Sequence, residues 1–349
     1  MTARGGLVRE FAVPLLIVGG SVIGLAGVLA AAGYDAGPAL EAMWRGAFGS
    51  VDAFASGTLV RSVPLILIAL GFAFALRGGM LNIGAEGQFL AGATVAAWIG
   101  VHLTAWPAVA AIPATWLMAV AAGMLWMLIP VMLRVKYGVL EVISTLLLNF
   151  VAEALVSFMV QGPLQERTGI YPQSDPIADA ARLPLFPGTR LHLGIVVALV
   201  VAAGLWYFFA RTLAGFRLLA AGSGPRAAVL VGRIDVTRMA AVALFVSGGL
   251  AGLAGAMEVG GVSFALYPNL SPGYGFTAIA VALLARLHPP AIVVTGMLFG
   301  ALETGAGAMQ RDAGIPAVIV YVVEAVVILA LLLADARARK VRAFGGAMA

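Results

Sequence analysis

Long apolar runs of about 20 residues, almost free of charge, recur along this sequence and limit what it can fold into. A helix of about that length spans the hydrocarbon core of a bilayer, which is roughly 30 Å thick. Helices bond their own backbone N–H and C=O groups and therefore need no water at that depth. Only 11% of the residues are charged, whereas soluble domains carry roughly 25%. We therefore predict an all-α, polytopic transmembrane bundle.

The apolar runs predict about ten crossings, or eight to ten because two segments are interrupted. No stretch is polar enough to form a soluble domain, so residues 1–349 are expected to form a single transmembrane domain. The expected helices are residues 11–32, 59–76, 88–105, 108–133, 140–160, 192–210, 239–257, 277–285, 291–309 and 316–334. Residues 161–191, which contain five prolines, are expected to form an external loop, and residues 335–349 a tail.

Basic residues indicate the orientation of the bundle. Most of the 21 lysines and arginines fall on one side if both termini are cytoplasmic. The positive-inside rule favours this orientation, with residues 211–238 and 335–349 inside. The excess positive charge is spread over helix ends and forms no patch, which argues against a nucleic-acid partner. The chain has no cysteine, so disulfides and thiolate metal sites are excluded.

Residues 77–92 interrupt the apolar pattern with five glycines and three polar side chains, Asn82, Glu86 and Gln88. Interrupted helices in transporters tend to mark the substrate path, so we predict a broken segment that lines a permeation pathway. Glu86 either lines this path, as acids at membrane depth often do, or caps the following helix. The two amides are expected to satisfy unwound backbone.

Residues 259–285 contain a second interruption, rich in glycine and proline. Its polar and aromatic candidates for the path are Ser271, Tyr274, Phe276 and Thr277. Two further candidates, Asn149 and Glu303, lie far from the ends of their predicted helices, where a polar side chain needs a partner or a function. Between the interruptions, Gly248, Gly252, Ala256 and Gly260 recur at four-residue spacing and predict a tightly packed helix face.

The basic segment 211–238 is expected to contain a short helix, because Pro225 suits a first helical position and Gly232 a position past the end. The segment 211–238 is either a docking site for a cytoplasmic partner or a loop whose positive charge only fixes the topology. The chain lacks the glycine-lysine spacing of a phosphate-binding loop, so it is not expected to hydrolyse ATP. Its three histidines lack the spacing of metal ligands, and no catalytic constellation is recognisable.

Four stretches together resemble the permeases of ABC importers of the branched-chain amino acid, simple sugar and nucleoside class, and most closely the nucleoside/simple-sugar branch. They are Arg77–Gln88, with the specific string Asn-Ile-Gly-Ala-Glu-Gly-Gln, then Glu141–Asn149, Gly273–Leu284 and Leu298–Glu303. The resemblance covers about residues 10–335. One departure is Gly224, where the family often has asparagine before the proline.

The resemblance implies several partners: cytoplasmic ABC ATPase subunits that bind ATP and magnesium, a second permease that is identical or related, and an extracytoplasmic substrate-binding protein. It implies a multi-pass location in the bacterial inner membrane, within the lipid bilayer, with no cofactor in this chain. It also implies that the segment from Arg211 onward docks on the ATPase. The coupling residues would be Gly215, Arg217, Gly222, Gly224, Pro225, Arg226, Ala227, Ala228, Gly232 and Arg233.

The expected function is therefore that of a transport subunit and not an enzyme. It would translocate nucleosides, or related ribosyl and simple-sugar compounds, by alternating access. The alternative is an ion-coupled secondary transporter that uses Glu86, Glu303 or Glu324.

Overall fold

The computed structural model describes residues 23–316, 318–319 and 321–322. Within these residues the chain forms helices and no strand, apart from one isolated bridge between Leu185 and His192. The predicted all-α class is confirmed. Most of the predicted first and tenth helices, Glu324 and the tail lie outside the described residues, so the predictions for them stand as predictions.

The chain divides into two compact units. The smaller unit includes residues 23–54 and the described residues from 301 onward, and the larger unit is residues 55–300. In the smaller unit, helix α2 (Ala36–Phe48) begins at Asp35, whose side chain accepts a hydrogen bond from the Gly37 N–H. Met43 of α2 shares a small apolar core with Leu29 and Met309.

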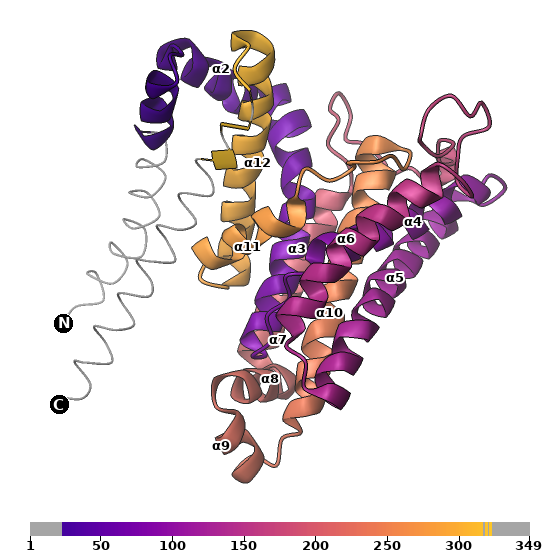
Figure 1. The fold of residues 1–349 in the computed structure, drawn as a ribbon, viewed down its shortest axis with the longest axis vertical. Coiled ribbons are helices and arrows are strands. Elements are labelled where there is room, and N and C mark those ends of the chain that lie inside the picture. Colours follow the sequence, from indigo (N-terminus) through magenta and orange to yellow (C-terminus); the bar gives the residue numbers. More distant parts are fainter. Residues whose placement is uncertain (1–22, 317, 320, 323–349) are drawn as a thin grey trace. The chain divides into compact units, whose positions relative to one another are not determined.

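The larger unit contains the helices that position the candidate site (Figure 1). They are η1 (Ala53–Leu59), α3 (Val60–Arg77), α4 (Ala85–His102), α5 (Ala108–Tyr137), α6 (Glu141–Val160), η2 (Asp179–Ala181), α7 (Gly194–Arg211), α8 (Leu213–Ser223), α9 (Pro225–Leu230), α10 (Val236–Glu258), η3 (Val259–Ser263), α11 (Tyr274–Leu284) and α12 (Pro289–Ala313). The first residues of η1 and the second half of α12 belong to the smaller unit.

Six of the described segments are long and apolar enough to cross a membrane. They are Ala53–Arg77, Ala108–Tyr137, Glu141–Val160, Gly194–Arg211, Val236–Ser263 and Pro289–Ala313. Helices α5, α6 and α7 also leave many large apolar side chains exposed, which suits contact with lipid. The chain is accordingly a multi-pass membrane protein.

The two interruptions are shorter than predicted, because the helix that follows each one starts earlier. Helix α4 begins at Ala85, so the first interruption is residues 78–84, shorter than the predicted 77–92. Gly87 and Gly92 lie inside α4, where they permit close packing: a side chain at Gly92 would collide with the backbone of Gly252. Helix α11 likewise begins at Tyr274, three residues before the predicted start.

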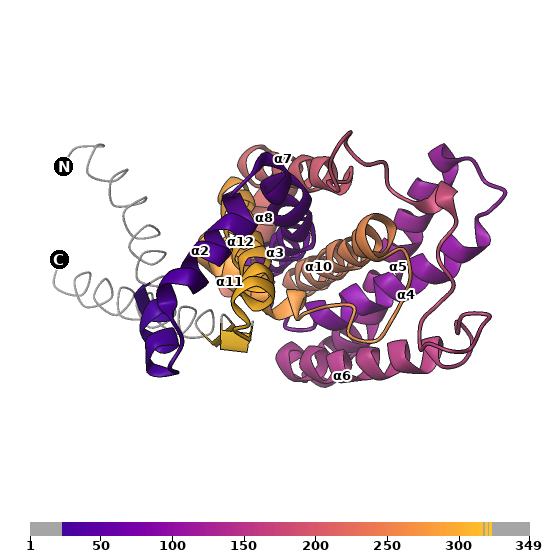
Figure 2. The same cartoon turned by 90° about the horizontal axis from the view of Figure 1, so that it is seen from above.

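The predicted small-residue face of α10 is confirmed at Gly248 and Gly252, whereas Gly260 lies beyond α10, in η3, against Leu183. Gly248 and Gly252 lie directly against the backbone of Ala119 and Gly123 in α5, and Gly255 lies against α4 at Phe89. Figure 2 shows α4, α5 and α10 side by side. A side chain at any of these glycines would force the helices apart, so close contact between α10 and its two neighbours depends on their absence.

Residues 161–191 form an irregular segment with one short 3-10 turn, as the proline content predicts. The segment is tied to the second interruption by hydrogen bonds from Ile177 N–H to the Phe264 carbonyl and from Leu183 N–H to the Gly260 carbonyl, each 2.8 Å long. It ends at His192, which is fully buried and accepts a hydrogen bond from the Gly194 N–H at Nδ1 (3.2 Å).

Burial lowers the pKa of His192 to about 4. In the unfolded chain the pKa of the His192 ring is near 6.5. Between about pH 6.5 and about pH 4 the unfolded chain therefore binds a proton at His192 more readily than the folded chain does. Stability should therefore fall as the pH falls through that window, by about 2 kcal/mol between about pH 7 and about pH 5.

The apparent unfolding temperature of the detergent-solubilised chain at each pH measures this effect. His192→Asn keeps an acceptor for the Gly194 N–H but has no titratable ring, and it should lose less stability on acidification. Equal losses in the two proteins would contradict the assignment to His192.

Candidate functional site

The first interruption is held together by a pair of buried amides, Asn82 and Gln88. Asn82 Nδ2 donates to Gln88 Oε1 (2.8 Å), and Gln88 Nε2 donates back to Asn82 Oδ1 (3.1 Å). Asn82 also accepts from the Gly84 N–H (3.0 Å) and donates to Ser247 Oγ of α10 (2.9 Å). As predicted, Asn82 satisfies backbone that no helix pairs. The same prediction is wrong for Gln88, whose side chain bonds to the Asn82 side chain and to no backbone group of the described residues.

Asn149 of α6 bonds to the same interruption and to the first turn of α4. Its Oδ1 accepts from the Gly87 N–H (2.9 Å), and its Nδ2 donates to the Ile83 carbonyl (3.0 Å). The side chain is buried, with 2% of its residue surface exposed. In this conformation the Asn149 amide therefore fixes the path of the backbone between α3 and α4.

Glu86, in the first turn of α4, joins the two interruptions. Its Oε2 accepts from the Gly275 N–H of α11 (2.6 Å), and it also bonds to the Ser271 side chain. Gly275 lies against the backbone of Glu86 so closely that a side chain there would collide with it. The carboxylate thus caps the N-terminus of α11, and not that of its own helix, and its negative charge suits the positive end of the α11 dipole.

The second interruption presents α11 to Glu86. Ser271 Oγ accepts from the N–H groups of Gly273 (3.1 Å) and Tyr274 (3.0 Å), which starts the helix. The buried Tyr274 accepts from Arg61 Nη1 of α3 (2.7 Å) and packs edge-on against Phe89 of α4. Both ends of the Tyr274 side chain are therefore held by neighbouring helices.

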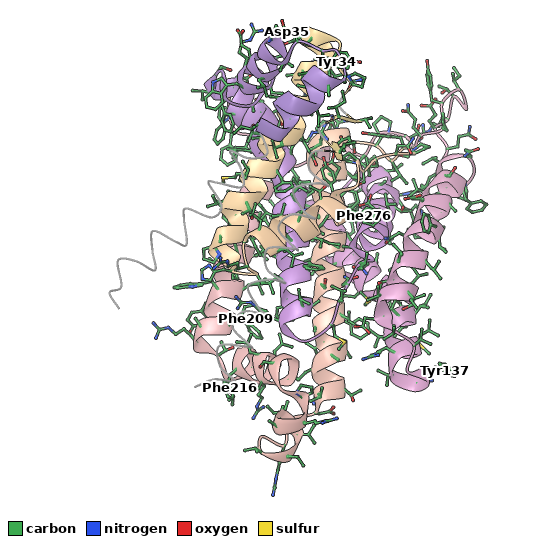
Figure 3. The ribbon with its side chains drawn as sticks, turned by 60° about the vertical axis from the view of Figure 1, so that its left-hand side comes forward. Tyr34, Asp35, Tyr137, Phe209, Phe216 and Phe276 are labelled. Carbon is green, nitrogen blue, oxygen red and sulfur yellow. The ribbon has the colours of Figure 1, made fainter. Side chains whose placement is uncertain are left out.

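The next residues of α11 are more accessible. Phe276 is 43% exposed, and Thr277 and Ser271 are partly exposed. Figure 3 shows Phe276 well above Phe216 along the long axis of the larger unit. Of the candidates on this unit, these three are the ones open to solvent or to a ligand, whereas Asn82, Glu86, Gln88, Asn149 and Tyr274 are buried.

The first interruption contacts the predicted coupling segment at its other end. Gly222 of α8 lies against the backbone of residues 77–79, where a side chain would collide with the Arg77 carbonyl and the Gly79 N–H. Gly79 adopts a positive φ of 83°, which glycine tolerates best. The Arg77 guanidinium lies 4.7 Å from the centre of the Phe209 ring at the end of α7. Residues 78–84 therefore connect α8 to Glu86 and α11.

The segment 211–238 folds into two short helices, one more than predicted. Thr212 caps α8 by accepting from the Gly215 N–H (3.0 Å), and Pro225 is the first residue of α9, as expected. Figure 1 shows both helices at one end of the larger unit, beyond α7 and α10. Their outer surface is apolar and basic: Phe216 is 63% exposed, Leu230 82% and Val231 86%.

The other predicted coupling residues divide by burial. Gly215 and Ala228 are buried, and Gly222 and Gly224 are partly exposed. The exposed ones are Arg217, Pro225, Arg226, Ala227, Gly232 and Arg233. Exposed apolar side chains rimmed by charged residues mark sites that contact a protein or a membrane.

Glu303 is the remaining candidate for the path. It lies in α12, in the smaller compact unit, and is partly exposed. Among the described residues, histidine, aspartate and glutamate side chains form no group of three or more that would hold a metal ion. The arrangement in the larger unit holds and positions helices.

Comparison with known proteins identifies the family. The model of the family described as "branched-chain amino acid transport system / permease component" matches residues 54–333, which include both interruptions and the coupling segment. The chain belongs to this permease family. Its members are transport components, so the match favours the permease function over the ion-coupled alternative. No solved structure matches the chain significantly.

Three curated relatives are similar over most of this permease. The guanosine ABC transporter permease NupP of Bacillus subtilis is 35% identical over 91% of both chains. The nucleoside ABC transporter permease NupB of Lactococcus lactis is 32% identical over 92% of this chain and 90% of its own. The glucose ABC transporter permease TsgB13 of Haloferax volcanii is 39% identical over 79% of this chain and 75% of its own.

Three contacts of the permease could not be found from its sequence. Ser247 is one of several small residues on α10, and nothing in the sequence distinguishes it from them. Only the structure shows its hydrogen bond to Asn82. Arg61 has no sequence signal that links it to Tyr274. The contact between Glu86 and Gly275 joins residues that no sequence pattern links.

Gly275→Ala should destabilise the permease, because the methyl group would force α11 away from Glu86. Overpacking of this kind costs about 1–3 kcal/mol, which should appear as a lower unfolding temperature in detergent. Gly204→Ala is the matched control, since Gly204 lies in α7 with no atom near its added methyl group. The contact would be refuted if the two variants unfolded at the same temperature.

Proposed function

We propose that this permease translocates nucleosides across the bacterial inner membrane as the transmembrane subunit of an ATP-driven importer. The observation that carries the substrate class is the similarity to the guanosine and nucleoside permeases, which extends over nine-tenths or more of this chain. The glucose permease is more identical but over a shorter region. Simple sugars are therefore the second candidate, and both classes carry hydroxylated rings.

The two interruptions would form the moving part of the pathway. Glu86 binds the N-terminus of α11 in the conformation seen here, and this contact joins the first interruption to the second. Alternating access requires the two to separate and rejoin, so the hydrogen bond between Glu86 and Gly275 would break once in each cycle. The exposed Phe276, Thr277 and Ser271 beside it would then contact the base and hydroxyl groups of the ligand.

The buried amides would have a different role. Asn82, Gln88 and Asn149 bond to one another's segments and to the backbone, which keeps residues 78–84 in one shape. A segment of fixed shape transmits displacement from one end to the other. Because Gly222 of α8 lies against one end and Glu86 is at the other, movement of α8 would reach α11 through this segment.

Cytoplasmic ATPase subunits would drive that movement by docking on α8 and α9, and they would hold the ATP and magnesium. A second permease, identical or related, would complete the pathway, and an extracytoplasmic binding protein would deliver the ligand. This arrangement places both termini in the cytoplasm and residues 161–191 outside. The basic residues at the ends of the apolar segments support that orientation.

Reconstituted transport tests the proposal. Proteoliposomes that contain the permease, its ATPase and permease partners and the binding protein should accumulate labelled guanosine only when ATP is supplied. Excess unlabelled nucleoside should compete, and excess glucose should not. Uptake that required an ion gradient and no ATP, or that only glucose inhibited, would refute the proposal.

The Glu86→Gln variant should show slower uptake in the same assay. Glutamine can still accept from the Gly275 N–H, but a neutral acceptor bonds about half as strongly as a carboxylate. A loss of about 1 kcal/mol at this contact corresponds to uptake that is roughly fivefold slower. Glu41→Gln is the control, because Glu41 is exposed and pairs only with Arg45 on the same helix (3.6 Å). Equal uptake in the two variants would exclude a role for the Glu86 charge.

Docking of the ATPase is tested separately by Leu230→Asp. Leu230 is 82% exposed on α9, so the change should not disturb folding but should place a charge in the docking surface. We expect at least tenfold less ATPase to co-purify with the variant, since burying an unpaired charge is costly. Ile170→Asp, at a residue 71% exposed in the segment 161–191, should co-purify normally. Normal co-purification of both variants would place the docking surface elsewhere.

A further inference from the structure

An open groove with a volume of about 400 Å³ lies between the ends of α5 and α10 nearest the coupling segment. Its apolar lining is contributed by Val131, Met132 and Val135 of α5 and by Ala241 of α10. Figure 3 shows Tyr137, the last residue of α5, at the same end of the larger unit as Phe216 of α8. The groove therefore lies at the end of the bundle that the proposed orientation places in the cytoplasm.

The groove follows from the way the two helices pack. They touch backbone to backbone where Gly123 meets Gly248. Lys136 is about 20 Å farther along α5, at 1.5 Å per residue. Helices pack at a crossing angle and so diverge away from the point of contact, and here side chains leave a groove between them. Below the small cluster of Met127, Val131 and Leu244, the gap remains open.

Charge at the groove is mainly positive. Lys136 and Arg238 line it and are exposed. The one acidic lining residue, Asp235, caps α10 by accepting a hydrogen bond from the Arg238 N–H (2.9 Å). The nearby Arg134 is already paired with Glu141 (3.4 Å). The groove is therefore lined by two cations and one carboxylate, and the N-terminus of the 23-residue helix α10 adds partial positive charge.

The apolar side of the groove continues onto the surface of α5 that suits contact with lipid. Leu125, Leu128, Ile129, Met132 and Val135 are all at least 41% exposed and recur at helical spacing. Both α5 and α10 are among the segments able to cross a membrane. A ligand in the groove can thus place a charged group at the cations and an apolar chain along α5 without leaving the bilayer.

We propose that this groove binds an anionic phospholipid. The phosphate would lie between Lys136 and Arg238, and one acyl chain would follow Val135, Met132 and Ile129 along α5. Basic pockets between crossing helices on the cytoplasmic side bind acidic lipid headgroups for the same physical reason. The proposal requires that α5 and α10 cross the membrane, and it is independent of which solute the permease carries.

Native mass spectrometry of the full-length permease in detergent tests the proposal. Dioleoyl-phosphatidylglycerol should bind more tightly than dioleoyl-phosphatidylcholine. The double variant Lys136→Gln/Arg238→Gln should lose roughly fivefold affinity for phosphatidylglycerol per cation, on the order of 25-fold in all. Arg211→Gln/Arg286→Gln removes two exposed cations elsewhere and should bind phosphatidylglycerol like the wild type.

A second variant separates the lipid from a free anion. Thr237→Trp adds bulk to the groove without changing its charge, and it should also weaken phosphatidylglycerol binding. Glycerol 3-phosphate, which has the headgroup chemistry and no acyl chain, should not displace the lipid at equal concentration. Displacement by glycerol 3-phosphate, or unchanged lipid affinity in either groove variant, would overturn the proposal. So would loss of ATPase co-purification by the Lys136/Arg238 variant with its lipid affinity unchanged, because the groove would then be a protein interface.

Discussion

The fold of the larger unit depends on one requirement: polar backbone groups inside an apolar bundle must find partners when a helix stops. Residues 78–84 leave such groups between α3 and α4, and the N-terminus of α11 leaves more. Side chains supply the partners in both places. Asn82 and Asn149 bond the backbone of the first interruption, and Ser271 and Glu86 bond that of α11. Without these side chains neither interruption would persist away from water.

The same bonds determine which parts of the permease can separate. The amide network lies wholly within one short stretch and its immediate neighbours, so breaking it would cost several buried hydrogen bonds at once. The contact between Glu86 and α11 consists of fewer hydrogen bonds, those to Gly275 and Ser271, and is therefore easier to break. Rearrangement should therefore begin there, with residues 78–84 moving as one piece.

Much of the fold could be predicted because the bilayer dictates it. A helix that crosses needs an apolar run of defined length, and most of the described helix ends fall within a few residues of those runs. The first interruption was predicted too long because a glycine that opens a turn and a glycine that admits a neighbour look alike, as Gly92 shows. The partners of polar residues could not be predicted, since Gly275 is 189 residues from Glu86.

Backbone contact at Gly123, Gly248 and Gly255 has a mechanical consequence. Ordinary helix pairs slide because side chains at their interface change rotamer and absorb small shifts. Where main chain meets main chain there is nothing to rearrange, so α4, α5 and α10 form a stiff frame that shifts only as a whole. Flexibility is then confined to elements attached to the frame at its edges, among them α11 and the short helices that a motor subunit would push.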